Sequence, residues 1–477
     1  MYFFICMKYS SEIQFTFFCA GSFIIYRHGT HTLSYKDDAM KKTVFVSAFH
    51  LIYISVLAKI LSFLVRILLA RKLGSEAMNY YSLTAPTMVF LISMVQQGIP
   101  GALSKLSAQK SNPRVPLYAS AVITAVTVTA VILLYSAAIP FLAHDLLHET
   151  KLIPILQAIL PLLPAVALSG VLKGYLYGIQ HHYQANATQL YEEAARILFL
   201  IICFSYTMPH DPIDLAVTAM YSVCAGEVAS CLYMMLHLKF SYHHVVVLPK
   251  ALKQVNRTDI REVLKISMPM MGSRISGSLT YFLEPILMLV FVSESLKPVL
   301  IEAYGSLNGY TLPLLTMPSF LSITLSNYLL PAFSYALAHR QSRQAKKSCM
   351  MILSCCLCFG IGYSLLCFFF HEQLFQLFYH TTKGSHQLRL LSLPFLLYSL
   401  QPPLSSLLHA CSMSSQAFTD TLLGSCFRLA SVCFLASYFQ ENALLFALSG
   451  GMMITTILHA ARLLYFFIKR RSHANAV

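Results

Sequence analysis

Long apolar runs separated by short polar segments cover most of the chain. Twelve of these runs are long enough to form the helix of about 20 residues that crosses a lipid bilayer. They lie at residues 45–69, 80–99, 116–141, 153–177, 188–207, 214–237, 263–292, 307–333, 348–370, 387–411, 417–438 and 442–468. The pattern predicts an all-α polytopic membrane protein with about 12 transmembrane helices.

A basic connector divides the predicted spans into two sets of six. It covers residues 239–262, between the sixth and seventh spans, and most other connections are short. We therefore expect an N-terminal six-helix lobe at 40–238 and a C-terminal six-helix lobe at 263–477. Residues 1–39 are interpreted as an N-terminal extension outside the native protein, because their apolar run is too short to span comfortably. The natural start is then expected at Met40, directly before Lys41-Lys42 and the first strong span.

Short segments of the first lobe recur 231 or 232 residues later in the second. The repeated segments are Ile99-Pro100-Gly101-Ala102 with Leu330-Pro331-Ala332-Phe333, and Gln184-Ala185 and Arg196 with Gln416-Ala417 and Arg428. Matches at one offset favour a six-helix unit duplicated in parallel orientation. Two such lobes around a central cavity are the design of many alternating-access transporters.

Lysine and arginine are concentrated in alternate loops and in both flanking segments. Under the positive-inside rule, these loops and both termini face the cytoplasm. The alternate loops hold few cations and carry acids such as Asp145 and Glu149. A multi-pass membrane protein with cytoplasmic N- and C-termini is the expected arrangement.

Composition supports a membrane protein and excludes much enzyme chemistry. Hydrophobic residues make up 57% of the chain and charged residues 11%, whereas an ordinary soluble chain has about 25% charged residues. The net charge of +15 suits an anionic membrane face or substrate better than nucleic acid. Most of the 13 cysteines lie inside apolar runs, where a thiol is most simply a small hydrophobic residue. No metal site, phosphate loop or nucleophile elbow is recognisable, so no metal, no cofactor and no enzymatic activity are expected.

Ionisable residues inside predicted spans need an explanation, because each costs about 2.5 to 3.5 kcal/mol at the bilayer centre. Lys59 and Arg66 lie in the first span, nearly two helical turns apart, on one face. Their spacing would allow a diphosphate to be held at two points. The alternative for Arg66 is that it reaches the outer interface together with Arg71 and Lys72.

The seventh span contains Arg274 and Glu284. They are ten residues apart, too far along one helix to pair directly. Each therefore needs a partner on another helix or a water-filled cavity. Contact with substrate or a coupling ion is the functional hypothesis, and a structural ion pair is the alternative.

The remaining charged residues of the spans are interpreted as structural. Glu192 and Arg196 are four residues apart and are expected to pair on one helix face. Arg428, at the position that matches Arg196 in the repeat, has no acid four residues before it, so it is expected to cap helix ends or to contact lipid phosphates. Glu227 lies beside Gly226, where helix contact is favoured over a proton relay.

Several motifs, in order, resemble one family of membrane exporters. They are Ala58-Lys59-Ile60-Leu61, the segment from Gln97 to Leu106, Leu172-Lys173-Gly174-Tyr175, and Tyr304-Gly305 followed by Pro313 and Pro318. Together they resemble the stage V sporulation protein B and polysaccharide-biosynthesis exporter family. This family belongs to the multidrug/oligosaccharidyl-lipid/polysaccharide exporter superfamily, which also contains the MurJ-like lipid II flippases. The resemblance extends over about residues 40 to 470.

The resemblance implies two six-helix lobes around a cationic central cavity that opens alternately to the two sides. In such flippases basic residues of the first helix bind the lipid diphosphate, which assigns Lys59 and Arg66 to substrate binding. Arg274 is carried over as a cationic residue of the seventh helix, and Glu284 is the leading acid for ion coupling. The chain departs from MurJ-type members by having twelve spans rather than fourteen, and Lys59 stands where arginine is common.

The expected function is translocation of an undecaprenyl-diphosphate-linked saccharide, such as a lipid II-like peptidoglycan precursor or another polysaccharide unit. The expected partners are this polyprenyl-diphosphate-linked saccharide, membrane lipids and a monovalent coupling ion. A multidrug cation antiporter of the same superfamily is the alternative, and it would need acids facing the cavity. A membrane glycosyltransferase would need paired outer-loop carboxylates, for which only Asp211 and Asp214 are available. A non-transporting scaffold for wall synthesis is a further alternative.

Overall fold

The computed structural model describes residues 33–110, 112–206, 211–242, 255–326, 333, 342–411 and 413–475. Helices make up nearly all of this part of the chain, and it contains no strand. The all-α fold expected from the apolar runs is therefore confirmed. The chain divides into two units, residues 1–50 and 51–477. Most of the predicted N-terminal extension lies outside the described residues, and all site residues discussed below belong to the second unit.

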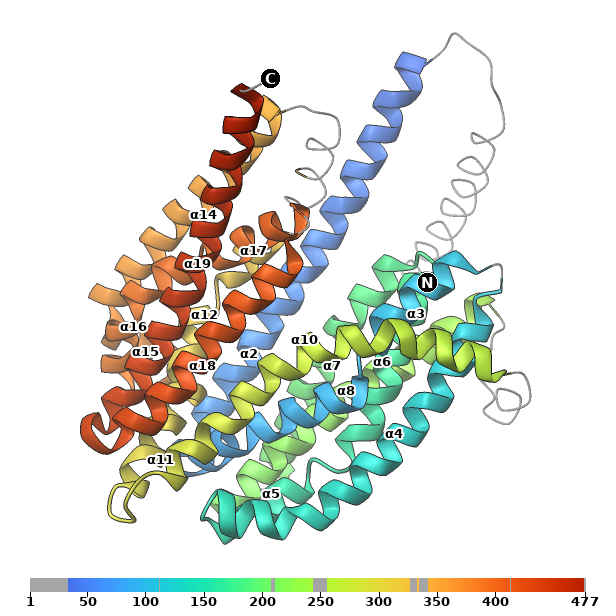
Figure 1. Cartoon of the computed structure of the whole chain (residues 1–477). Coiled ribbons are helices and arrows are strands. Elements are labelled where there is room, and N and C mark those ends of the chain that lie inside the picture. The colour runs from blue at the N-terminus through green and yellow to red at the C-terminus, as the bar shows by residue number, and fades with distance from the viewer. Residues whose placement is uncertain are drawn as a thin grey trace. The chain divides into compact units, whose positions relative to one another are not determined.

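The first half of the second unit runs from the later part of α2 to α8 (Figure 1). Its elements are α2 (Leu33–Gln96), α3 (Ile99–Gln109), α4 (Arg114–Phe141), η2 (Leu142–Leu146), η3 (Thr150–Leu152), α5 (Ile153–Gln157), α6 (Leu162–Gly178), α7 (His182–Tyr206) and α8 (Pro212–Tyr242). The closest helix pairs within it are α7 with α8 and α3 with α6. We call this part the N-terminal half.

The C-terminal half follows the basic connector, of which residues 243–254 lie outside the described residues. Its elements are α10 (Arg257–Val290), α11 (Lys297–Ser306), η4 (Leu307–Thr311), α12 (Leu312–Thr316), α14 (Ser342–Phe369), α15 (His371–Tyr379), α16 (Ser385–Tyr398), α17 (Gln401–Ala410), α18 (Ser414–Phe439) and α19 (Glu441–Asn475). Helices α18 and α19 lie side by side along much of their length (Figure 1). They correspond to α7 and α8 of the N-terminal half.

Seven described helical stretches are long and apolar enough to cross a membrane. They are Tyr53–Gln109, Arg114–Leu146, Thr150–Gly178, Pro212–Lys239, Cys349–Phe369, Ser414–Phe439 and Asn442–Ile468. The first contains two of the predicted spans. The other predicted spans fail this test for visible reasons: α7 and α10 carry several charges, α16 and α17 are interrupted, and the eighth span lies partly outside the described residues.

Helix α2 changes direction at Gly74. Its backbone there has φ 74° and ψ 178°, a conformation that glycine reaches without the steric cost of a Cβ atom. The chain therefore passes from the first predicted span to the second with almost no loop. The sequence pattern had placed about ten residues between them, at 70–79.

Helix α10 contacts both halves. Its first part packs against α3 and α4, and its last part packs against α18. At the first contact a Cβ on Gly98 would lie 2.8 Å from Met270 Cβ, so this glycine allows the close approach of α10. The two predicted lobes are thus connected by one continuous helix as well as by the connector.

A single large cluster of buried apolar side chains also includes both halves. It contains Leu69 and Met78 of α2 together with Tyr304 of α11 and Leu391 of α16. Burial of apolar surface therefore holds the two halves together in this conformation.

Candidate functional site

Lys59 and Arg66 project from α2 without acidic partners. Lys59 is exposed and Arg66 is partly buried, and neither forms a hydrogen bond or an ion pair with a described residue. Arg66 lies within electrostatic reach of the hydroxyls of Tyr281 and Tyr379. A cation inside a membrane segment is costly unless something offsets its charge, so both side chains are available to an anionic ligand.

Arg274 of α10 contacts the part of α2 that follows the Gly74 kink. Its Nη1 donates to Gln96 Oε1 at 3.2 Å, and no acid pairs with it among the described residues. The rings of Phe90 and Phe282 stack with centroids 4.8 Å apart and hold the same two helices together. The structure shows no direct contact between Arg274 and Lys59. Gln96 was not predicted as a site residue, because a neutral amide gives no electrostatic signal in the sequence.

Glu284 forms an ion pair with Arg428 of α18. Arg428 donates from Nε to Glu284 Oε1 at 2.8 Å and from Nη2 to Oε2 at 2.5 Å. The Glu284 side chain is 1% exposed and that of Arg428 is 20% exposed. The expectation that Arg428 caps helix ends or contacts lipid phosphates is wrong, because Glu284 occupies its guanidinium. Both oxygens of Glu284, the acid predicted for ion coupling, are likewise in use in this conformation.

Polar groups connect Arg66 with this ion pair. Tyr281 lies within electrostatic reach of Arg66, Glu284 and Arg428, and its hydroxyl donates to Asn308 Oδ1 at 3.3 Å. Asn308 belongs to η4, a π-helical turn at the start of the predicted eighth span. Sequence analysis missed both residues, because tyrosine and asparagine in apolar runs resemble ordinary interface residues.

Five charged residues gather where α6, α7 and α8 meet. This N-terminal charge cluster consists of Lys173, Glu192, Glu193, Arg196 and Glu227. The predicted pairing of Glu192 with Arg196 is not the one observed. Arg196 Nη1 lies 3.2 Å from Glu193 Oε2, whereas Glu192 Oε2 lies 3.6 Å from Lys173 Nζ. Glu193 and Arg196 are three residues apart, which places them on the same helix face as effectively as a spacing of four.

A second buried cluster lies between α18 and α19. Asp420 accepts from Arg462 Nε at 2.6 Å, and its other oxygen lies 3.1 Å from His459 Nδ1. Asp420 is fully buried and His459 is 1% exposed. Sequence analysis did not single out these residues. The available signal was an acid and two basic residues at the matching ends of consecutive spans.

The part of α2 next to the Gly74 kink is hydrogen-bonded to the C-terminal half. Arg71 donates from Nε to the carbonyl oxygen of Phe378 and from Nη2 to that of Leu377, each at 2.7 Å. These carbonyls belong to the last turn of α15, where no helical donor remains for them. Tyr310 adds a hydrogen bond of 3.3 Å to the carbonyl oxygen of Gly74. The two halves are therefore closed against each other at this end.

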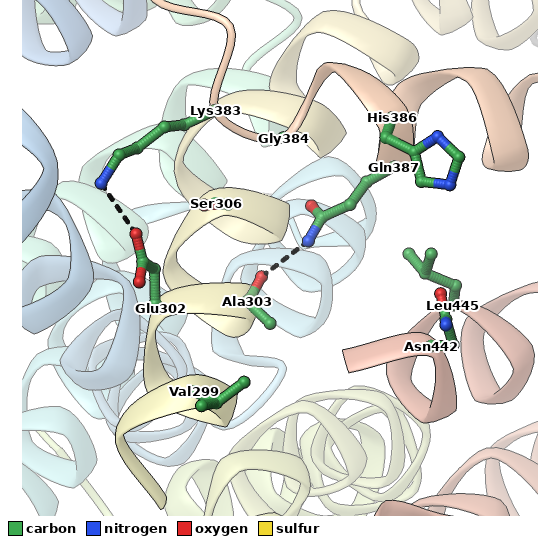
Figure 2. A pocket seen from close by; sticks show the side chains of 10 residues that line it. All are labelled: Val299, Glu302, Ala303, Ser306, Lys383, Gly384, His386, Gln387, Asn442 and Leu445. Atoms are coloured by element: carbon green, nitrogen blue, oxygen red, sulfur yellow. Dashed lines mark hydrogen bonds and ion pairs between the residues drawn. The ribbon is translucent and has the colours of Figure 1, made fainter. Parts of the chain in front are cut away.

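A separate cavity of about 240 Å³ lies among α11 and the starts of α16 and α19 (Figure 2). Lys383 and Glu302 form an ion pair of 2.7 Å beside it, and Gln387 donates to the carbonyl oxygen of Ala303. None of the predicted site residues lines it. The cavity is below the usual ligand-pocket range of about 300 to 1,000 Å³, and its lysine is already neutralised. It does not have the properties of a site for a large anionic cargo.

Comparison with known proteins gives the family. Residues 45–337 match the model of a family described as "Polysaccharide biosynthesis protein", which is more than half of the chain. The chain belongs to this family. The family identified by resemblance from the sequence motifs is thereby confirmed.

Two curated proteins of Bacillus subtilis (strain 168) are similar over most of their length. Stage V sporulation protein B is 29% identical over 438 residues, covering 88% of this chain and 83% of that protein. Sporulation protein YkvU is 25% identical over 422 residues, covering 85% and 91%.

Solved structures confirm the fold. A structure described as the inward-facing conformation of a multidrug resistance MATE family transporter of the MOP superfamily matches with a TM-score of 0.66. The match covers 89% of this chain and 99% of the other at 15% identity. The chain is thus a multi-pass membrane protein with a MOP transporter fold, and the expectation that it is not an enzyme agrees with its family.

Proposed function

We propose that the protein is a flippase that moves a polyprenyl-diphosphate-linked saccharide across the bacterial plasma membrane. The cargo would be an undecaprenyl-diphosphate carrying a lipid II-like peptidoglycan precursor or another polysaccharide unit. The saccharide and diphosphate would pass between the two halves while the polyprenyl chain stays in the surrounding lipid. Family membership and the MOP transporter fold support transport, and the site residues support an anionic cargo.

The observation that carries the proposal is the contrast between paired and unpaired cations. Arg196 and Arg428 each face a carboxylate at hydrogen-bonding distance. Lys59, Arg66 and Arg274 have no acidic partner among the described residues. Unpaired cations in membrane segments are expensive to keep, and a diphosphate would offset their charge when it binds. A cargo of organic cations would instead require unpaired acids at these positions.

Alternating access would use the tie between α2 and α15. Under the predicted topology the Gly74 end of α2 faces outward, so the Arg71 contacts close the outer side. Release of these hydrogen bonds would let the halves separate there and deliver the headgroup to the outer leaflet. The cycle requires only that cargo bind the two conformations with different affinity.

Complementation of a bacterial strain depleted of its lipid II flippase tests the proposal. Wild type and Lys59→Ala would be produced at equal membrane levels, with Lys72→Ala as the matched control, because Lys72 is an exposed cation of the same helix. We expect rescue by wild type and Lys72→Ala. Lys59→Ala should lower transport about tenfold or more, because losing a charge-assisted contact costs about 1.5 to 3 kcal/mol.

The other outcomes separate the parts of the proposal. Equal rescue by all three proteins would keep the flippase and remove Lys59 from its site. Absence of rescue by well-expressed wild type would contradict a lipid II-like cargo. Protection of the same cells against cationic drugs would then favour the antiporter.

A further inference from the structure

The N-terminal charge cluster is tightly enclosed by three helices. Gly226 of α8 permits the contact: a Cβ on it would lie 2.6 Å from Arg196 Cγ and 2.9 Å from the carbonyl oxygen of Glu192. One turn after Glu227 on α8, Cys231 Sγ donates to the carbonyl oxygen of Ala165 of α6 at 3.3 Å. The charges of α6, α7 and α8 therefore meet between closely packed helices, with side chains that are buried or partly buried.

The cluster has one more acid than it has cations. Lys173 is next to Glu192 and Arg196 is next to Glu193, which leaves Glu227 without an ion pair among the described residues. Glu227 Oε2 is fully buried and has no hydrogen-bond partner. An isolated ionised carboxylate removed from water is very costly and normally acquires a proton or a cation.

Glu227 also lies within electrostatic reach of Glu192. Two neighbouring carboxylates cannot both stay ionised cheaply, and such pairs commonly share one proton. The position is far from either end of α8: Glu227 lies 15 residues after Pro212 and 12 before Lys239, the limits of its membrane-spanning stretch. Glu227 therefore lies well inside its own membrane-spanning stretch, where water is scarce.

Two buried hydroxyls at the same level point to a missing partner. Ser230 Oγ and Ser169 Oγ are buried and make no hydrogen bond in the described structure, and these residues are 0% and 1% exposed. Ser230 follows Glu227 by one turn on α8, and Ser169 precedes Lys173 by one turn on α6, so each shares a helix face with a cluster residue. Buried polar atoms are nearly always satisfied, which indicates that the cluster takes up a further polar or charged species.

We propose that Glu227, together with Glu192, binds one exchangeable proton and that this proton is the coupling ion of the transport cycle. The inference rests on the proposed function for its role in transport, whereas the proton site stands on the cluster alone. Protonation removes the excess negative charge and lets α7 and α8 stay in contact. Deprotonation leaves a buried charge that draws Lys173 or Arg196 toward Glu227 and so changes the packing of the three helices.

The surroundings favour a proton over a metal ion. No group of three or more His, Cys, Asp or Glu side chains suited to a metal was found in the described part of the chain. The other titratable groups around Glu192 and Glu227 are Lys173 of α6, Glu193 and Arg196 of α7, and Cys224 and Cys231 of α8 itself. Helix α5, which also packs on α8, contributes no titratable side chain.

The acids of the C-terminal half are less suited to this role in the observed conformation. Glu284 holds Arg428 with both oxygens, and Asp420 holds Arg462 and His459. Neither has an unpartnered buried oxygen. Exchange of a proton there would first require an ion pair to break.

Infrared difference spectroscopy tests the site directly. The full-length protein in lipid bilayers would be titrated with acid and base, and the C=O stretch of protonated carboxyl groups would be followed. Wild type should show a buried carboxyl band of about one proton per molecule that appears and disappears with pH. Glu227→Gln should lose this band and Glu192→Gln should shift its midpoint, whereas Glu302→Gln, which removes an exposed acid elsewhere, should keep it.

A conservative variant separates loss of the carboxyl group from failure of a variant to fold. Glu227→Asp retains a carboxyl group and should restore a band with an altered midpoint. A titrating band that survives in both Glu227→Gln and Glu192→Gln overturns the proposal, as does its absence from wild type. A band that responds to sodium at constant pH would also overturn the proposal, because the site would then bind a metal cation instead of a proton. Because this readout needs no cargo, it is independent of the complementation assay and of the proposed function.

Discussion

Arg196 and Arg428 occupy equivalent places in the two halves, 232 residues apart, but they are held differently. Arg196 pairs with Glu193 of its own helix, whereas Arg428 reaches Glu284 of α10. The first pair stabilises α7 alone, and the second joins α18 to α10. The sequence offset therefore predicts that a charge recurs, but not which elements it connects.

The same offset relates Glu227 of α8 to His459 of α19. His459 contacts Asp420, whose charge Arg462 also balances, so acids and cations match in the cluster between α18 and α19. Glu227 has no such partner. The cluster between α18 and α19 is thus electrostatically balanced, whereas the N-terminal charge cluster carries one acid in excess. We infer that the N-terminal charge cluster is the one equipped to exchange an ion.

Removing Glu284 from its ion pair with Arg428 should have the largest effect on the free energy of unfolding. Glu284→Ala leaves Arg428 unpaired and should lower the free energy of unfolding by about 3 to 5 kcal/mol. Glu193→Ala should cost clearly less, because Glu192 and Glu227 remain close to Arg196. Thermal unfolding of the purified variants measures both. Equal losses would contradict the difference between the halves.

Loss of the Arg71 hydrogen bonds between α2 and α15 should have the next largest effect, which is on the populations of the closed and open conformations. Arg71→Ala removes two hydrogen bonds to α15 and should shift the balance toward the conformation open at that end by about tenfold. Arg71→Lys should give a smaller shift, because an ammonium group keeps the charge and can donate to one of the two carbonyls, although it cannot reproduce both parallel contacts. Distances between spin labels on α2 and α15 report the populations. Unchanged distances in Arg71→Ala would show that apolar packing alone closes this end.

Glycine substitutions test the helix contacts of the N-terminal charge cluster. Gly226→Ala places a methyl group 2.9 Å from the Glu192 carbonyl oxygen and should destabilise the protein by about 1 to 3 kcal/mol. Gly277→Ala on α10 is the matched control, because nothing lies within 4 Å of its Cβ position. This control should stabilise by about 0.5 to 1 kcal/mol. Thermal unfolding distinguishes the signs, and a neutral Gly226→Ala would mean that α7 and α8 separate easily.

The surface pair between α3 and α10 should have the smallest effect. Lys110 Nζ lies 2.6 Å from Glu262 and 3.2 Å from Asp259, and the hydrogen bond to Glu262 raises the pKa of Lys110. Its contribution is therefore complete at neutral pH and is lost only as pH rises through the raised pKa. The side chain is 29% exposed, so Lys110→Ala should cost less than about 1 kcal/mol. A larger loss, or one that high salt leaves unchanged, would contradict a screened surface pair.

The fold could be predicted because a bilayer imposes a strong and simple rule on each span. Apolar runs revealed the helices and their order, since a segment that crosses lipid must satisfy its backbone hydrogen bonds within a helix and carry apolar side chains. The break at Gly74 was not predicted, because a single glycine in φ-positive geometry leaves no trace in a hydropathy pattern. The shared helix α10 was not predicted either, because its contacts depend on how the halves pack.

The candidate site could be predicted in its residues but not in its pairs. Lys59, Arg66, Arg274 and Glu284 were identified because charges inside spans are rare. Arg428, 144 residues from Glu284, was given the wrong partner because sequence spacing describes neighbours along one helix only. Within α7 the choice between Glu192 and Glu193 depended on side-chain direction and on Lys173 of α6, which spacing does not contain.

Helix α10 packs on α3 and α4 at one end and on α18 at the other. On the proposed function, rocking of the two halves would therefore have to bend this helix. Gly272 and Gly277 have open space around their Cβ positions, so we expect the bend within this stretch. Arg274 lies inside the same stretch. A headgroup bound by Arg274 would then act on α10 at the place where the helix bends. Binding of the cargo and the change of conformation would thus be coupled through one helix.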